Sequence, residues 1–176
     1  MMNKLLSSLA LLPLALSCPF DLCDVPDSGS CGNACCKLSV AVPLPTEAVM
    51  SAINATLASG GPDGLYEAQM TAEGTLGFAD LRPFGAPADF IGQAFHATAN
   101  GLYVDTVNFN LSPTEDGGGT VVRAFSTSQV GGAFGDDGQN YYNIVGLLTE
   151  VDFGGDKADV NDFVNVDESC PKPAKR

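Results

Sequence analysis

The sequence predicts a two-layer α+β domain in which two helices cover one face of a mainly antiparallel sheet. Apolar residues recur at helical spacing in two segments, and the apolar period changes to two in the residues between them. Six cysteines, all but one near the N-terminus, add a predicted disulfide-stapled N-terminal segment. A chain of 176 residues with 45% apolar residues is long enough for one hydrophobic core.

The segment 1–17 has the features of a secretory signal peptide. Lys4 precedes an apolar run over 5–16, and small residues stand three positions and one position before a cleavage site at Cys18. We therefore expect a secreted or extracytoplasmic protein. A lipidated Cys18 is the alternative, although Ala15 stands where lipoprotein signals usually carry Leu. No later segment approaches the roughly 18 consecutive apolar residues of a membrane helix, so we expect no stable membrane span.

The cysteines predict structural disulfides, because an even number in an exported chain is typical of disulfide bridges. The adjacent Cys35 and Cys36 are expected to bridge to two different partners, and a bridge from Cys170 to the N-terminal cluster would staple the two ends together. A metal site is the competing interpretation, but no two of these cysteines are separated by two residues and no His lies near them. We therefore predict no metal and no cofactor. The predicted disulfide residues are Cys18, Cys23, Cys31, Cys35, Cys36 and Cys170.

The first regular elements follow the cysteine cluster. Alternation over 37–43 predicts a short strand, which Pro43 ends. Thr46 stands at the N-cap position of a predicted helix that stops before the Gly60-Gly61 pair. Asn54, in the sequence Asn-Ala-Thr, is a candidate glycosylation site if the host glycosylates secreted chains. The apolar stripe of this helix consists of Val49, Met50, Ile53 and Leu57.

The middle of the chain predicts an antiparallel sheet with one covered face, because Val107, Phe109 and Leu111 alternate with polar residues. Asn100-Gly101 is a hairpin signal, since both residues tolerate the positive φ of a type I′ turn. The predicted strand runs are 65–72, 92–99, 102–111 and 120–128.

A second helix is predicted over 140–151, with a wide apolar stripe that packs on the covered face of the sheet. The loop before it has a local structural role: its Asp residues can accept backbone N–H bonds, Gly138 can adopt positive φ, and Asn140 or Asp137 can cap the helix.

Three segments carry a resemblance to a known family. They read VNFNL at 107–111, VVRAFSTSQVG at 121–131 and DDGQN at 136–140, and the Pro26-Asp27-Ser28 segment followed by Cys31 is a fourth similarity. The chain thereby resembles the uncharacterised domain family DUF1499. The resemblance implies a strand, a second strand and a last helix in this order, and it implies no activity. Gln129 replaces an Arg that is common in the family.

The predicted domain organisation combines these observations. It consists of a signal peptide at 1–17, a Cys-rich segment at 18–36, a DUF1499-like α+β domain at 37–153 and an acidic tail at 154–176.

The polar residues of the family-like segments form a candidate ligand site. An Arg fork beside a helix N-terminus suits a carboxylate or a phosphate group. We expect these side chains to converge at the junction between the strand and the last helix, although a purely structural role in capping that helix is the competing interpretation. The candidate ligand-binding residues are Arg123, Ser126, Ser128, Asp137 and Asn140.

Charge and motif content exclude several functions. With 21 acidic and 8 basic residues, the formal net charge is −13, and no Lys/Arg stripe is present to meet a phosphate backbone, so we expect no nucleic-acid partner. His96 is the single histidine, and this excludes mechanisms that need two imidazoles. We expect His96 to be structural. Calcium binding at the aspartates between Asp152 and Asp162 is a competing interpretation, but these residues lack the EF-hand order and acidic tails are commonly solvated.

These observations favour a secreted binding or scaffold module without chemistry of its own, whose partner is a small molecule or a protein. One alternative is an enzyme or binder that acts on a small anionic ligand at the Arg/Ser/Asp patch. Another alternative is an acidic surface protein that sequesters cations. An enclosed pocket beside Arg123 would favour ligand binding, whereas a flat acidic face would favour cation sequestration.

Overall fold

The computed structural model describes residues 34–133, 136–166 and 169–170. The predicted signal peptide, the family-like segment at 26–31 and three of the predicted disulfide cysteines therefore lie outside the described residues. Those cysteines are Cys18, Cys23 and Cys31.

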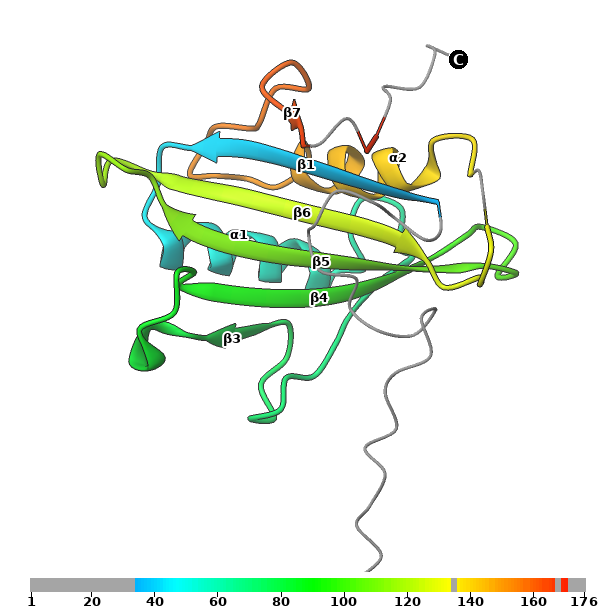
Figure 1. Cartoon of the computed structure of the whole chain (residues 1–176), viewed down its shortest axis with the longest axis horizontal. Helices are drawn as coiled ribbons and strands as arrows, with labels where there is room; N and C mark the ends of the chain where they lie inside the picture. Colours follow the sequence, from blue (N-terminus) through cyan, green and yellow to red (C-terminus); the bar gives the residue numbers. More distant parts are fainter. Residues whose placement is uncertain (1–33, 134–135, 167–168, 171–176) are drawn as a thin grey trace, which may run out of the picture.

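The described residues form one antiparallel sheet of seven strands (Figure 1). The strand order is β2-β4-β5-β6-β1-β7, and β3 pairs with β4 beside β2. With its two α-helices, this sheet confirms the predicted α+β fold class. The strands are β1 (Cys35–Val42), β2 (Tyr66–Ala68), β3 (Phe78–Asp80), β4 (Phe90–Ala97), β5 (Val104–Pro113), β6 (Thr120–Ser128) and β7 (Val164–Asn165).

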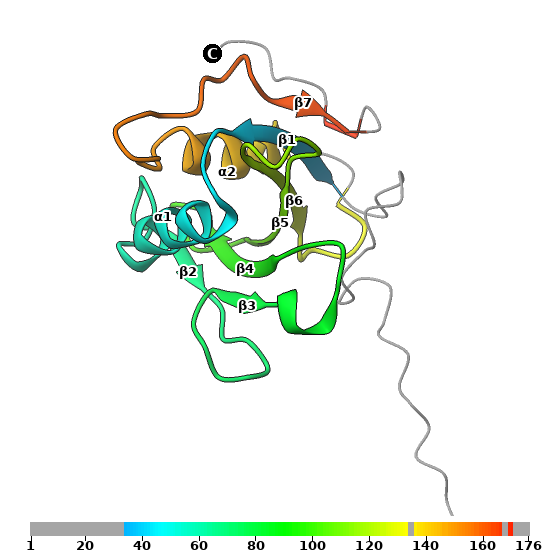
Figure 2. The ribbon, with the colours of Figure 1, turned by 90° about the vertical axis from the view of Figure 1, so that its left-hand side faces the viewer.

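The helices are α1 (Thr46–Ala58) and α2 (Gln139–Leu148), and a short 3-10 helix η1 (Arg82–Phe84) precedes β4. Figure 2 shows α1 and α2 on the same side of the curved sheet. The core lies between these layers because alternate residues of the strands point toward the helices: Val107, for example, lies opposite Ser126 and Ala94 in register, and all three are buried.

The start of α1 differs from the prediction. Pro45 occupies the N-cap position, no side chain caps the helix, and Thr46 is the first helical residue. The Thr46 hydroxyl instead donates a hydrogen bond of 2.6 Å to Asp89 Oδ2, directly before β4. The predicted capping role of Thr46 is therefore wrong, because its hydroxyl finds a carboxylate on another segment.

Turns and element ends correct the sequence predictions in three more places. The β4–β5 hairpin forms, but only Gly101 has positive φ, so Asn100 does not complete a type I′ turn and its Oδ1 accepts from Leu102 N instead. Helix α2 ends at Leu148 rather than at Val151. Strand β7 pairs with β1 from within the segment predicted as an acidic tail, so the sheet extends beyond residue 153.

The candidate glycosylation residue Asn54 lies in α1 and is half-buried. Its Nδ2 donates a hydrogen bond to the Leu76 carbonyl in the loop that connects β2 and β3. A glycan would be attached to this same nitrogen and would leave it one N–H for the contact between helix and loop. Glycosylation at Asn54 stays a prediction.

A disulfide joins Cys36 in β1 to Cys170, across a sequence separation of 134 residues. The predicted bridge between Cys170 and the N-terminal cluster is thus confirmed. Cys35 is also disulfide-bonded, so the two adjacent cysteines have different partners, as the sequence predicts. The side chain of Asn165 reinforces this closure, because its Oδ1 accepts from Cys170 N at 3.2 Å.

Candidate ligand-binding site

The face of the sheet that points away from the helices, the open face, carries two neighbouring rows of polar and apolar side chains. In antiparallel strands, residues that lie opposite one another in register point to the same face. Alternation with the buried residues places both rows on the open face. One row consists of Ile91, Asn110, Arg123 and Ser39, and the next consists of Gln93, Asn108, Phe125 and Lys37.

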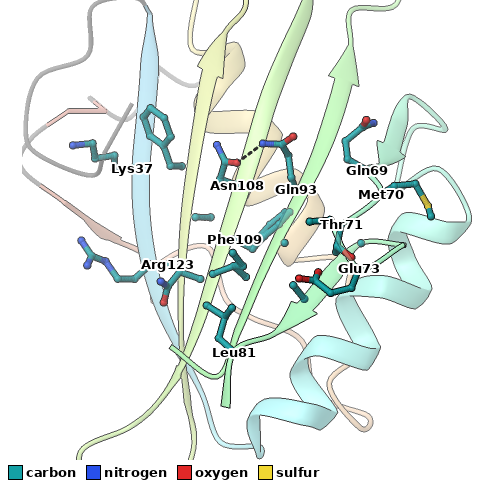
Figure 3. Close-up of a pocket in the computed structure, with 18 of the residues that line it drawn as sticks. Lys37, Gln69, Met70, Thr71, Glu73, Leu81, Gln93, Asn108, Phe109 and Arg123 are labelled. Atoms are coloured by element: carbon teal, nitrogen blue, oxygen red, sulfur yellow. Dashed lines mark hydrogen bonds between the residues drawn. The ribbon is translucent and has the colours of Figure 1, made fainter. Parts of the chain in front are cut away.

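A pocket of about 520 Å³ lies on the open face (Figure 3). Both rows contribute to its floor, and the loop that connects β2 and β3 bounds one side of it with residues 69–73. Leu81 bounds another side, and Val166, which follows β7, lies at the β1 side. Val166 is held there because its N–H donates to the Lys37 carbonyl. The pocket is thus built from five strands and three segments outside them.

The pocket has a polar side and an apolar side. On β4 and β5, Gln93 Nε2 donates a hydrogen bond of 2.8 Å to Asn108 Oδ1, and Asn110 lies in the next row. On the side of the β2–β3 loop, Met70 and Ile91 are 62% and 42% exposed and present apolar surface. Such a combination of apolar surface and a few polar groups is typical of small-molecule sites.

Positive charge is concentrated at this pocket. Within the described residues, the basic side chains are those of Lys37, Arg82, Arg123 and Lys157. Arg82 forms ion pairs with Asp80 and Glu47, and Lys157 pairs with Glu150. Lys37 and Arg123, which also have interaction partners, both line the pocket, where Glu73 is the acidic lining residue among those described. On a protein of net charge −13, this is a local exception to the acidic surface.

The predicted convergence of the five candidate ligand-binding residues is wrong. Ser126 and Asn140 do meet, since Ser126 Oγ donates to Asn140 Oδ1 at 2.6 Å on the helix side of the sheet. Ser128 is buried on that same side, whereas Arg123 is exposed and lines the pocket on the open face. The reason is strand alternation: Arg123 and Ser126 are three positions apart, and an odd spacing places two side chains on opposite faces. Asp137 is exposed in the turn before α2.

The buried members of that predicted site belong to a polar network between the sheet and α2. Asn143 is at its centre: its Nδ2 donates to Asp105 Oδ2 at 2.8 Å and to Ser126 Oγ at 3.1 Å. Its backbone carbonyl accepts a bond of 2.8 Å from the Tyr66 hydroxyl. Burial raises the pKa of Asp105, and the hydrogen bond from Asn143 opposes that rise. Burial also raises the pKa of Tyr66. The network attaches α2 to the sheet.

The start of α2 is stabilised by Asp136 rather than by Asp137 or Asn140. The Asp136 carboxylate accepts from Gly138 N at 3.0 Å and from Asn140 N at 2.7 Å. Gly138 adopts the expected positive φ of 83°, and Asp137 also has positive φ. The predicted local role of the loop is confirmed, but its capping residue is different.

His96 is buried on the helix side of β4, as expected of a structural imidazole. Its Nε2 lies 2.9 Å from Asp63 Oδ2, and its ring centroid lies 4.3 Å from that of Tyr66. Within the described part of the chain, its Nδ1 is buried and has no hydrogen-bond partner. Since His96 is not among the residues of the pocket, it does not serve as a base there.

The described acidic residues show no metal centre. No group of three or more His, Cys, Asp or Glu side chains in residues 34–133, 136–166 and 169–170 could hold a metal ion. Of the aspartates considered for calcium, Asp152 accepts from Gly155 N and Asp159 accepts from Asn161 N, so both stabilise their own turns.

Comparisons with protein-family models, with curated proteins and with solved structures found no match. The resemblance to DUF1499 therefore stays a prediction. Among the described residues, no helix is long and apolar enough to cross a membrane.

The raised pKa of Asp105 predicts a pH-dependent stability. Because the folded protein binds this proton more tightly than the unfolded chain, ionisation of Asp105 costs stability as the pH rises through its folded pKa. Asp105→Asn keeps an oxygen that accepts from Asn143 and cannot ionise. Urea unfolding should therefore show the variant gaining stability relative to the wild type as the pH rises above the ordinary range of an aspartate pKa. A difference in unfolding free energy between the variant and the wild type that does not change with pH would contradict the conclusion that burial raises the pKa of Asp105.

Proposed function

We propose that the protein is a non-catalytic binding module of an extracytoplasmic compartment, which holds a small organic molecule in the pocket on the open face. The pocket volume of about 520 Å³ supports this proposal, because small-molecule sites commonly fall in this range. The Cys36–Cys170 disulfide supports the compartment, since stable disulfides are typical of oxidising environments.

The separation of the pocket from three buried titratable groups on the helix side favours binding over catalysis. Asp105, His96 and Tyr66 are buried on the helix side, whereas the pocket opens on the other face of the sheet. Acid–base catalysis requires such a group within hydrogen-bond reach of the substrate. The described pocket lining contains no His, Cys or Ser that could combine with a base as a nucleophile.

The location of the pocket beside Arg123 is the observation that carries the proposal. A protein that sequesters cations through its surface would be expected to present a flat acidic face, whereas here a hollow with apolar walls includes two basic residues, Lys37 and Arg123. Cation sequestration by the acidic segment after residue 153 stays a separate hypothesis. A scaffold that binds a protein partner would not need a hollow of this kind.

A fluorescence titration with N-phenyl-1-naphthylamine, a neutral apolar dye, tests this function. Ala79 lines the pocket on β3, so Ala79→Trp should fill part of the hollow and weaken dye binding by about tenfold or more, which corresponds to roughly 1.4 kcal/mol. Ala41→Trp is the matched control, because Ala41 is exposed on the open face of β1 and is not part of the pocket. The same affinity in both variants, with intact circular dichroism, would refute the proposal.

A further inference from the structure

We infer that the ligand of this pocket is an anionic amphiphile, with its acid group beside Arg123 and its apolar body extending toward Ile91 and Met70. This inference rests on the proposed function and adds the chemistry of the ligand. Three features of the pocket lead to it: the donors on its polar side, the exposed apolar surface on its other side, and the position of its one described acidic residue.

The two asparagines on the polar side of the pocket offer hydrogen-bond donors to a ligand. The Asn108 Oδ1 is occupied by Gln93 Nε2 at 2.8 Å, and the Asn110 Oδ1 accepts from Ser112 Oγ at 3.1 Å. Each asparagine therefore turns its carbonyl oxygen to a neighbour on the sheet, and its NH₂ group is the part that can serve a ligand. A group recognised by amide N–H donors must supply acceptor oxygens.

Arg123 makes this donor set cationic. It lies directly opposite Asn110 in register, so its guanidinium and the Asn110 amide belong to the same row of the open face. A guanidinium has five N–H donors in a planar fork that matches the two oxygens of a carboxylate. A carboxylate, sulfonate or phosphate group fits a fork with an adjacent amide donor, whereas the charge of an ammonium group would be repelled by the guanidinium.

The apolar side determines the rest of the ligand. Ile91 is the neighbour of Asn110 on the other side of the row, and Ala79 of β3 lies opposite Ile91. Met70 and Leu81 also line the pocket, and Figure 3 shows Met70 on the side away from Arg123. The open face thus changes from cationic to apolar along one row, and burial of apolar surface by a ligand would stabilise the complex.

Glu73 indicates the orientation of the ligand. This residue belongs to the β2–β3 loop, and Figure 3 shows it on the side of the pocket away from Arg123. A carboxylate near Glu73 would be repelled, so the acid group of the ligand is directed to β6 and its apolar body to the loop. The two ends of the pocket therefore discriminate between the two ends of an amphiphile.

Displacement of N-phenyl-1-naphthylamine by three ten-carbon probes tests the inference: decanoate, 1-decanol and decyltrimethylammonium, each below the concentration at which it forms micelles. We expect decanoate to displace the dye at about tenfold lower concentration than 1-decanol, and the cationic probe to bind most weakly. Arg123→Gln should remove most of the preference for decanoate. Lys157→Gln makes the same change of charge at an exposed residue outside the pocket and should keep the preference.

The outcomes separate this inference from the proposed function. Equal displacement by decanoate and 1-decanol, with dye binding still abolished by Ala79→Trp, would overturn the anionic ligand and leave the binding module intact. An affinity for the dye that Ala79→Trp leaves unchanged would overturn the proposed function itself. Should Arg123→Gln fail to fold, Asn110→Asp replaces an amide donor by a repelling carboxylate on the same row and should also abolish the preference. A preference that persists in that folded variant would contradict the inference.

Discussion

Replacement of Asn143 by alanine is expected to lower the free energy of unfolding by about 3 kcal/mol, because it leaves a buried carboxylate without its main donor. Asn143 is fully buried, and its Nδ2 contacts both Asp105 Oδ2 and Ser126 Oγ. Its Oδ1 accepts a bond of 2.7 Å from Gln139 Nε2 in the preceding turn of α2. The variant therefore loses three hydrogen bonds and creates a cavity beneath the helix.

Urea unfolding, followed by circular dichroism, measures this loss. Asn161→Ala is the control with the same chemical change, since Asn161 is exposed and contacts only its own turn, and we expect a change within about 0.5 kcal/mol there. A double variant, Asn143→Ala with Asp105→Asn, should lose less than the sum of the separate effects because the uncompensated charge is gone. Additive losses would show that the two side chains do not interact.

Removal of the Cys36–Cys170 disulfide is expected to have an effect of similar size. The bridge spans 134 residues of sequence, and closure of so long a loop is worth about 4 to 5 kcal/mol in the chain-entropy model. We expect the double variant Cys36→Ala with Cys170→Ala to lose about 4 kcal/mol of unfolding free energy, measured by urea denaturation under non-reducing conditions. A loss below about 1 kcal/mol would show that the described fold does not depend on this bridge.

The same bridge affects the pocket. Val166 lies between β7 and Cys170, and its N–H bond to Lys37 holds it at the β1 side of the pocket. Strand β7 contributes only two paired residues, so the disulfide is the main covalent constraint on this segment. In the double cysteine variant, at a temperature where it remains folded, N-phenyl-1-naphthylamine should bind several-fold more weakly. Unchanged binding would indicate that Val166 is held without the bridge.

The alternation of apolar residues made the sheet predictable. The same alternation also indicates which polar residues lie on the opposite face, and the predicted site did not take this into account. Val107, Phe109 and Leu111 were expected on the covered face, which implies that Asn108 and Asn110 lie on the other. These two asparagines line the pocket and were missed as candidates. The odd spacing between Arg123 and Ser126 likewise indicates opposite faces of β6, so their separation could have been found from the sequence.

Other features depend on contacts between segments that are distant in the chain. The β2–β3 loop bounds the pocket because its Leu76 carbonyl accepts from Asn54 of α1, a contact across 22 residues that no local pattern indicates. Strand β3 contains three residues and β7 contains two. Such short segments cannot show the alternation of apolar and polar residues that predicts a strand. Asn143 lies on the buried side of α2, where an apolar residue is the usual choice, so the network around Asp105 has no signal in periodicity.

A nitrogen-15 NMR titration with decanoate tests most directly whether the open face is a ligand site. We expect saturable chemical-shift changes in the open-face rows of β4, β5 and β6 and in residues 69–73, with the largest changes near Arg123 and Asn110. Resonances around Asn143, on the helix side, should change little. Changes that fail to saturate, or that concentrate on α1 and α2, would contradict a ligand site in this pocket.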